Sequence, residues 1–244
     1  MQILLNADDF GKSHDVNSAI CRCFDDGIIQ RTTIMATERL FDEAVILSRE
    51  HNFFDKVGLH LNLDDGVPLS NEMRNNTHFC EDGHYKDRIF LNSKYRYFLS
   101  RNDRHCVKRE IEAQMTKYLE AGFTLRHFDS HHFVHNNLSI IFIVSKIGKR
   151  LGFQSTRLME IKPSESMPKR LYKSILNSYL KRRFNTSGQF LQKIDSFNIV
   201  KGSVEFMVHP KMVESELLNV VSWNPDRYEN FEDYAEFISR VKSL

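Results

Sequence analysis

The stretch that decides the fold is ILLNADDFG, at residues 3–11. An apolar run opens it, and the run gives way at once to the polar residues Asn6, Asp8 and Asp9. A short buried strand with polar side chains at its carboxyl end is typical of parallel α/β sheets and barrels, whose functional sites lie at that edge. Adjacent aspartates on a regular strand point to opposite faces, so for both to serve one site the chain must leave strand geometry at Asp8 or Asp9. Phe10 and Gly11 supply such a break, because glycine permits backbone angles that other residues resist.

Two neighbouring carboxylates suit hydrolytic chemistry. One carboxylate can bind a divalent cation while the other takes a proton from the attacking water. The alternative is that Asp8 or Asp9 caps the helix that follows.

Strand and helix patterns alternate along the rest of the chain. Apolar residues at helical spacing, between a capping Ser13 and a terminating Gly27, predict the first helix. Further strands are predicted at 32–35, 57–63, 124–129, 153–158 and 204–208, and further helices at 41–50, 107–119, 138–151, 168–183 and 231–241. This alternation predicts an α/β fold with a largely parallel sheet, and a (β/α) barrel is the first choice.

The length of 244 residues suits one sizeable core, so we expect a single domain over residues 1–244. Residues 64–104 are polar, irregular and rich in Asn and Asp, with several aromatic residues among them. Such a stretch predicts a long insertion or lid.

The composition excludes several classes of partner. A formal charge of +2 gives no strong field for nucleic acid or an anionic membrane, and we interpret the basic stretch at 169–183 as a solvated helix face. The four cysteines lack the paired spacing of a zinc ribbon or a disulfide framework. Without a leader or a long apolar run, the sequence predicts a soluble cytoplasmic protein that binds a small neutral molecule, with a homodimer as a candidate assembly.

A second polar cluster, GLHLN at 58–62, ends the strand predicted at 57–63. Alternation places His60 and Asn62 on one face and the leucines on the other. A lone buried histidine is most often structural, but a position at a strand end beside the other clusters favours a functional role.

The third cluster, HFDSHHFVH at 127–135, holds four histidines and an aspartate within nine residues. Packing explains such a cluster poorly, because every buried imidazole needs a hydrogen-bond partner. If the segment stays extended, His127, Asp129 and His131 share one side; if it turns helical, His131 and His135 share one helix face. Either geometry predicts a divalent-metal or catalytic site.

A fourth feature is EFMVHP at 205–210, in which His209 ends an apolar strand. Alternation along the strand lets its imidazole point into a barrel mouth. The alternative is a loop histidine held by Pro210.

With these motifs in view, the sequence resembles the YdjC-like carbohydrate deacetylases, the family of chitooligosaccharide deacetylase. The resemblance is carried by NADDFG at 6–11, TT at 32–33, GLH at 58–60, HFDSHH at 127–132 and EFMVHP at 205–210. It implies a (β/α) barrel-like fold related to polysaccharide deacetylases, a divalent metal usually described as magnesium, and removal of acetate from N-acetylated amino sugars. The chain departs from many relatives at Thr37, Phe133 and Lys211, where they have Asn, His and Gly.

The resemblance also assigns roles. His60 and His131 correspond to the family's metal-binding histidines, Asp9 to the ligating aspartate and Asp8 to the neighbouring base. Two histidines and a carboxylate suit zinc or cobalt as well as magnesium.

In the expected reaction Asp8 takes a proton as water attacks the acetamide carbonyl, and His209 protonates the departing amine. Residues expected to orient the ligands or contact substrate are His127, Asp129, Asn62 and His135. The rival readings are a metal-dependent hydrolase of another bond and a non-catalytic sugar-binding relative.

Overall fold

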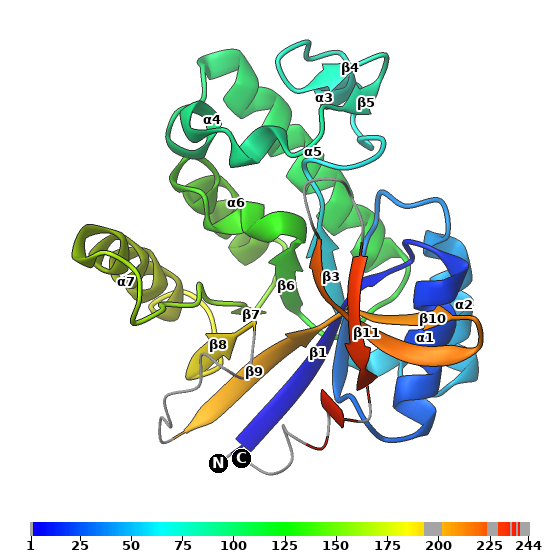
Figure 1. Ribbon diagram of the computed structural model, residues 1–244. Coiled ribbons are helices and arrows are strands. Elements are labelled where there is room, and N and C mark those ends of the chain that lie inside the picture. Colours follow the sequence, from blue (N-terminus) through cyan, green and yellow to red (C-terminus); the bar gives the residue numbers. More distant parts are fainter. Residues whose placement is uncertain (1, 193–201, 224–228, 235, 238, 240–244) are drawn as a thin grey trace. The chain divides into compact units, whose positions relative to one another are not determined.

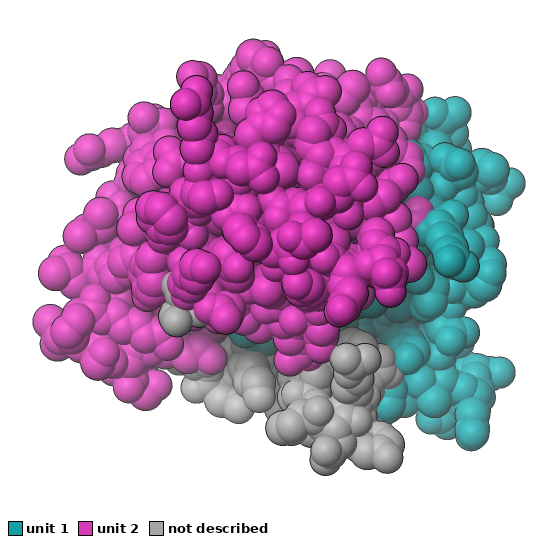
Figure 2. Space-filling view, turned by 90° about the horizontal axis from the view of Figure 1, so that it is seen from above, with its two compact units in different colours: residues 1–34, 39–57, 187–244 teal, residues 35–38, 58–186 magenta. Residues whose placement is uncertain are grey.

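The computed structural model describes residues 2–192, 202–223, 229–234, 236, 237 and 239 (Figure 1). The chain falls into two compact units (Figure 2). Unit 1 comprises residues 1–34, 39–57 and 187–244, and unit 2 comprises residues 35–38 and 58–186. Within the described ranges, no helix is long and apolar enough to cross a membrane. The single catalytic domain expected from the sequence stays a prediction.

Unit 1 is built on four parallel strands in the order β2-β1-β9-β8. These strands are β1 (Gln2–Phe10), β2 (Arg31–Ile34), β8 (Gln189–Leu191) and β9 (Ser203–Val208), and the helices are α1 (His14–Asp25), α2 (Phe41–Glu50) and the short η1 (Phe54–Lys56). The Ser13 hydroxyl accepts a hydrogen bond from Val16 N and caps α1, as predicted. The helix α2 has the bounds that its apolar spacing indicated.

A second sheet in unit 1 is antiparallel and was not predicted. It consists of β10 (Pro210–Val213), β11 (Glu216–Trp223) and β12 (Glu229–Asp233), in that order. Glu214 and Ser215 join β10 to β11 with φ angles of 47° and 74°, so both turn residues are left-handed. The helix predicted at 231–241 is wrong at its start, where β12 lies, and part of the rest falls outside the described residues.

Unit 2 holds three parallel strands in the order β7-β6-β3. The strands are β3 (Val57–Leu61), β6 (His127–Ser130) and β7 (Ser155–Thr156), and the main helices are α5 (Arg101–Glu120), α6 (Leu138–Arg150) and α7 (Met167–Lys181). Phe128 of β6 packs edge-on against Phe153 and Phe184, with ring centroids 5.8 and 5.2 Å away. Parallel strands that alternate with helices confirm the predicted α/β class.

The segment at 64–104 is more ordered than its composition suggested. It contains α3 (Asn71–Arg74), β4 (Cys80–Glu81), β5 (His84–Tyr85), the short η2 (Ile89–Leu91) and α4 (Ser93–Tyr97). Asp82 and Gly83 form the left-handed turn between β4 and β5.

Two buried carboxylates of α5 anchor this segment. Glu110 accepts hydrogen bonds from Leu69 N at 3.0 Å and from the backbone and hydroxyl of Ser70, each at 2.7 Å. Asp103 accepts one from Asn76 Nδ2 at 3.0 Å. These contacts tie the segment to the core of unit 2, and its function as a lid stays a prediction.

Candidate functional site

The two aspartates near the carboxyl end of β1 are both buried, with 1% of Asp8 and 6% of Asp9 exposed. Asp9 has a φ of 68°, and the register of β1 against β2 shifts between Ala7 and Phe10. The chain therefore leaves regular strand geometry at Asp9 itself, one of the two positions expected, and does so before Gly11. Aspartate is among the few non-glycine residues that accept this left-handed conformation readily.

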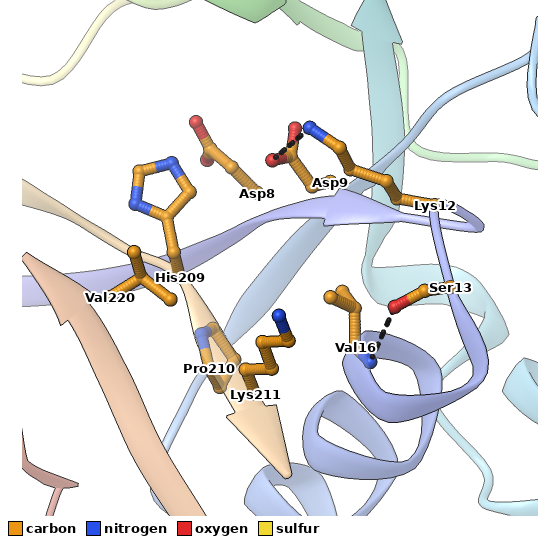
Figure 3. A pocket seen from close by; sticks show the side chains of 9 residues that line it. All are labelled: Asp8, Asp9, Lys12, Ser13, Val16, His209, Pro210, Lys211 and Val220. Atoms are coloured by element: carbon orange, nitrogen blue, oxygen red, sulfur yellow. Dashed lines mark hydrogen bonds and ion pairs between the residues drawn. The ribbon is translucent and has the colours of Figure 1, made fainter. Parts of the chain in front are cut away.

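Unit 1 forms a pocket around these aspartates (Figure 3). Its lining residues are Asp8, Asp9, Lys12, Ser13, Val16, His209, Pro210, Lys211 and Val220. In Figure 3 the imidazole of His209 lies beside the carboxylate of Asp8, while the Lys12 ammonium is 3.4 Å from Asp9 Oδ2. The candidate base and the candidate acid thus line one pocket.

Strand β11 fixes the backbone of His209. Asn219 Oδ1 accepts a hydrogen bond from His209 N at 2.9 Å, and Val220 N donates to the His209 carbonyl at 3.0 Å. The sequence did not predict β11, so these two contacts were absent from the alternative in which Pro210 holds a loop histidine.

Unit 2 brings His60 and His131 together. Their ring centroids are 5.7 Å apart, and a ring nitrogen of each lies within 4.8 Å of the other. Both residues are buried, with 1% and 8% exposed. His60 is the fourth of the five residues of β3, and His131 follows directly after the end of β6. Two closely spaced imidazoles of this kind are a common part of a divalent-metal site.

A buried chain of charges supports His60. Asp129 Oδ1 lies 2.7 Å from His60 Nδ1, and Asp129 Oδ2 lies 2.7 Å from Arg157 Nη2. Because a carboxylate paired with a guanidinium is an acceptor, the Nδ1 of His60 donates, and in the neutral imidazole the Nε2 then keeps a lone pair. Metal-binding histidines commonly carry this carboxylate contact on the far nitrogen.

Sequence reasoning missed Arg157, whose side chain is fully buried. The available signal was an arginine inside an otherwise strand-like apolar stretch at 153–158, since a buried arginine needs a carboxylate or carbonyl partner.

Neither geometry expected for residues 127–135 describes the segment fully. β6 ends at Ser130, and His132 and Phe133 then adopt left-handed φ angles of 47° and 57°. The turn directs His132 Nδ1 to within 3.0 Å of Asp64 Oδ2. His131 therefore shares neither a continued strand nor a regular helix face with the other histidines.

His127 and His135 contact other parts of unit 2. His127 Nδ1 lies 3.1 Å from Ser155 Oγ. The two ring nitrogens of His135 lie 2.5 Å from Ser130 Oγ and 3.2 Å from the Arg157 carbonyl. Burial lowers the pKa of His135 to about 4, so this imidazole is neutral at neutral pH.

Asn62 orders the turn after β3. Its Oδ1 accepts hydrogen bonds from the backbone of Asp64 and Asp65, and its Nδ2 donates to Thr37 Oγ1 at 2.9 Å. Asp65 Oδ2 lies 3.8 Å from His131 Nε2. A chain of contacts thus links Asn62 to His131 through Asp65.

Comparisons with known proteins show what the chain as a whole is similar to. A family model described as YdjC-like protein matches residues 2–240. The chain is 31% identical over 232 residues to a carbohydrate deacetylase of Thermoanaerobacter pseudethanolicus, with 92% of this chain and 87% of the relative covered. It is 26% identical to a carbohydrate deacetylase of Clostridium beijerinckii, with 95% and 90% covered.

A solved structure from Enterococcus faecalis V583, named as a candidate cellobiose-phosphate cleavage protein, has a similar fold. The TM-score is 0.68 at 20% identity, with 88% of this chain and 82% of that chain covered. This likeness confirms the predicted α/β, (β/α) barrel-like fold.

Proposed function

The chain belongs to the YdjC-like family, and from this membership we propose that it is a metal-dependent hydrolase that removes acetyl groups from N-acetylated amino sugars. The related proteins of Thermoanaerobacter and Clostridium are carbohydrate deacetylases, which are hydrolases of amide bonds. The observation that carries the proposal is the buried chain from Arg157 through Asp129 to His60, which prepares one imidazole for a metal beside a second, His131.

We assign the metal to Asp9, His60 and His131. The two histidines of unit 2 suit a divalent cation. The hydrogen bond to Asp129 leaves Nε2 of a neutral His60 with a lone pair, and a ring nitrogen of His131 lies close to His60. When bound, a divalent cation would polarise the amide carbonyl and acidify water. Magnesium follows from the family resemblance, whereas the two imidazoles also suit zinc and cobalt.

Two residues of the pocket in unit 1 transfer the protons of the reaction. Asp8 accepts a proton from the attacking water, and His209 donates one to the sugar amine as the carbon–nitrogen bond breaks. Both side chains line this pocket, and β11 fixes the backbone of His209. Burial of Asp8 keeps bulk water from competing for the proton.

From the resemblance to chitooligosaccharide deacetylase, we propose a short chitooligosaccharide as the substrate. The direct test is acetate release from N,N′-diacetylchitobiose by protein stripped of metal and then given Mg²⁺, Zn²⁺ or Co²⁺ in turn. We expect release only after metal is restored. Sugar binding without release under every metal would favour the non-catalytic reading, and hydrolysis of a phosphoester instead would favour the other hydrolase.

Two matched variants separate metal binding from general damage. His131→Ala should lose metal and activity together. His84→Ala removes an exposed histidine of β5, whose Nδ1 lies 3.0 Å from the Asp82 carbonyl, and should keep both. If His131→Ala retains full activity, the assignment of His131 is wrong.

A further inference from the structure

A row of polar side chains shares one face of the sheet in unit 1. Asn6 and Asp8 are two residues apart on β1 and therefore point to the same side. Arg31 on β2 is the register partner of Asn6, and Glu205 on β9 pairs with Leu4 one step earlier on that face. Asn6 is fully buried, so each of its polar atoms needs a partner.

The amide of Asn6 has only one orientation that fits these neighbours. Arg31 Nε donates to Asn6 Oδ1 at 2.6 Å, and Arg31 Nη2 forms an ion pair with Glu205 Oε1 at 2.8 Å. A guanidinium can donate but never accept, so the atom of Asn6 that faces Arg31 must be the oxygen. The amide nitrogen is consequently turned toward Asp8.

That nitrogen donates to Asp8 Oδ1 at 2.7 Å and, more weakly, to Thr33 Oγ1 at 3.3 Å. Hydrogen bonds from an amide to a carboxylate are short and directional. The contact therefore fixes the plane of the Asp8 carboxylate in the pocket that also contains His209.

We propose that Asn6 is a positioning residue for the base Asp8, with Arg31 and Glu205 holding the amide in the donating orientation. This inference rests on the proposed function, because it assumes that Asp8 takes the proton. Asn6 is fully buried and its polar atoms contact Arg31, Asp8 and Thr33, so it would act through Asp8 and not on the substrate. Its contribution is to keep Asp8 from rotating away from the position in which proton transfer is possible, which raises kcat and leaves substrate binding alone.

The sharpest test is Asn6→Asp, which keeps the shape and the oxygen toward Arg31 but replaces the donor toward Asp8 with a carboxylate oxygen. We expect kcat for acetate release to fall at least as far as in Asn6→Ala, about 10- to 100-fold, the range for one hydrogen bond to a charged group. KM and the number of bound metal ions should not change. If Asn6→Asp restores the activity that Asn6→Ala loses, only shape matters and the proposal is wrong.

The matched control is Asn177→Asp. Asn177 is a buried asparagine of α7 whose amide bonds the backbone of Met159 through both of its polar atoms. The isosteric change breaks a comparable donor outside the pocket, so it measures the general effect of a new buried carboxylate. We expect it to lower the melting temperature while kcat stays within about twofold.

Two further measurements separate this proposal from the proposed function. In a double-mutant cycle, Asn6→Ala should cause no further loss in an Asp8→Asn background, whereas additive losses would show that Asn6 does not act through Asp8. A crystal structure of Asn6→Ala should show the Asp8 carboxylate rotated from its present plane. An inactive wild type would refute the deacetylase function, while an unmoved Asp8 would refute the positioning role whether or not the wild type is active.

Discussion

Asp129 determines which ring nitrogen of His60 carries the proton, and so whether Nε2 can bind a metal. It is fully buried, and its two oxygens are divided between His60 Nδ1 and Arg157 Nη2, each at 2.7 Å. Asp129→Asn keeps the shape but removes the charge. The new amide can direct only one oxygen, and Arg157, which needs an acceptor, will take it. The amide nitrogen then faces His60 and donates to Nδ1, which forces the proton onto Nε2.

The change should therefore act on stability and on metal binding through separate routes. Leaving Arg157 buried without its carboxylate should lower the free energy of unfolding by about 3 to 5 kcal/mol. Moving the proton to Nε2 of His60 should weaken metal binding by about 10- to 100-fold, the range for loss of a partner behind a ligating histidine.

The assay is a titration with Co²⁺, followed by its visible absorption, together with a urea melt of the metal-free protein. Asp103→Asn is the matched control, because Asp103 is another buried aspartate of unit 2 that bonds Asn76 and Ser100. That control should be destabilised and yet bind Co²⁺ as the wild type does. Cobalt affinity of Asp129→Asn within twofold of wild type would show that Asp129 does not determine which nitrogen of His60 carries the proton.

Three further predictions follow from other buried contacts. Glu110→Ala should lower the free energy of unfolding by about 2 to 4 kcal/mol, because the buried donors of Leu69 and Ser70 lose their acceptor. It should also speed proteolysis within 64–104, and unchanged proteolysis would contradict the anchoring role. His135 has a pKa of about 4 in the folded state against an ordinary 6.5, so the folded state binds fewer protons than the unfolded state between these values. The free energy of unfolding should therefore fall by up to about 3 kcal/mol as the pH drops from 6.5 to 4. In urea melts, His135→Gln should show a smaller dependence on pH. Ser13→Ala should cost about 1 kcal/mol of unfolding free energy through the lost cap of α1, and a loss below about 0.3 kcal/mol would count against the cap.

The regular parts of the fold were predictable because local patterns determine them. The apolar spacing of α2 and the cap of α1 are encoded within one or two helical turns. The apolar run of β1 likewise indicated a buried strand, and the strand continues through both aspartates to Phe10.

The hairpins were missed for two different reasons. Glu214 and Ser215 form a left-handed turn without the glycine or asparagine that usually marks one, so the sequence carried little warning of β10 and β11. Asp82-Gly83, in contrast, is a strong hairpin signal that the irregular surroundings of 64–104 obscured.

The candidate site was predictable as a set of residue types but not as a set of contacts. The sequence pattern indicated Asp8, His60 and His131 as polar residues near the carboxyl ends of parallel strands, and their roles stay a prediction. The residues that support them are distant in sequence: Arg157 lies 28 residues beyond Asp129. Ion pairs of this kind depend on which strands become neighbours, and no local pattern encodes that choice.

We propose that one divalent metal, bound through His60 and His131, is required for amide hydrolysis. The most direct measurement is the initial rate of acetate release from N,N′-diacetylchitobiose as metal is added back to stripped protein in steps of a fraction of an equivalent. We predict a rate that rises from near zero and reaches a plateau at about one equivalent per chain for the wild type, and no rise for His131→Ala. A full rate of acetate release in the presence of excess chelator would show that no metal is required.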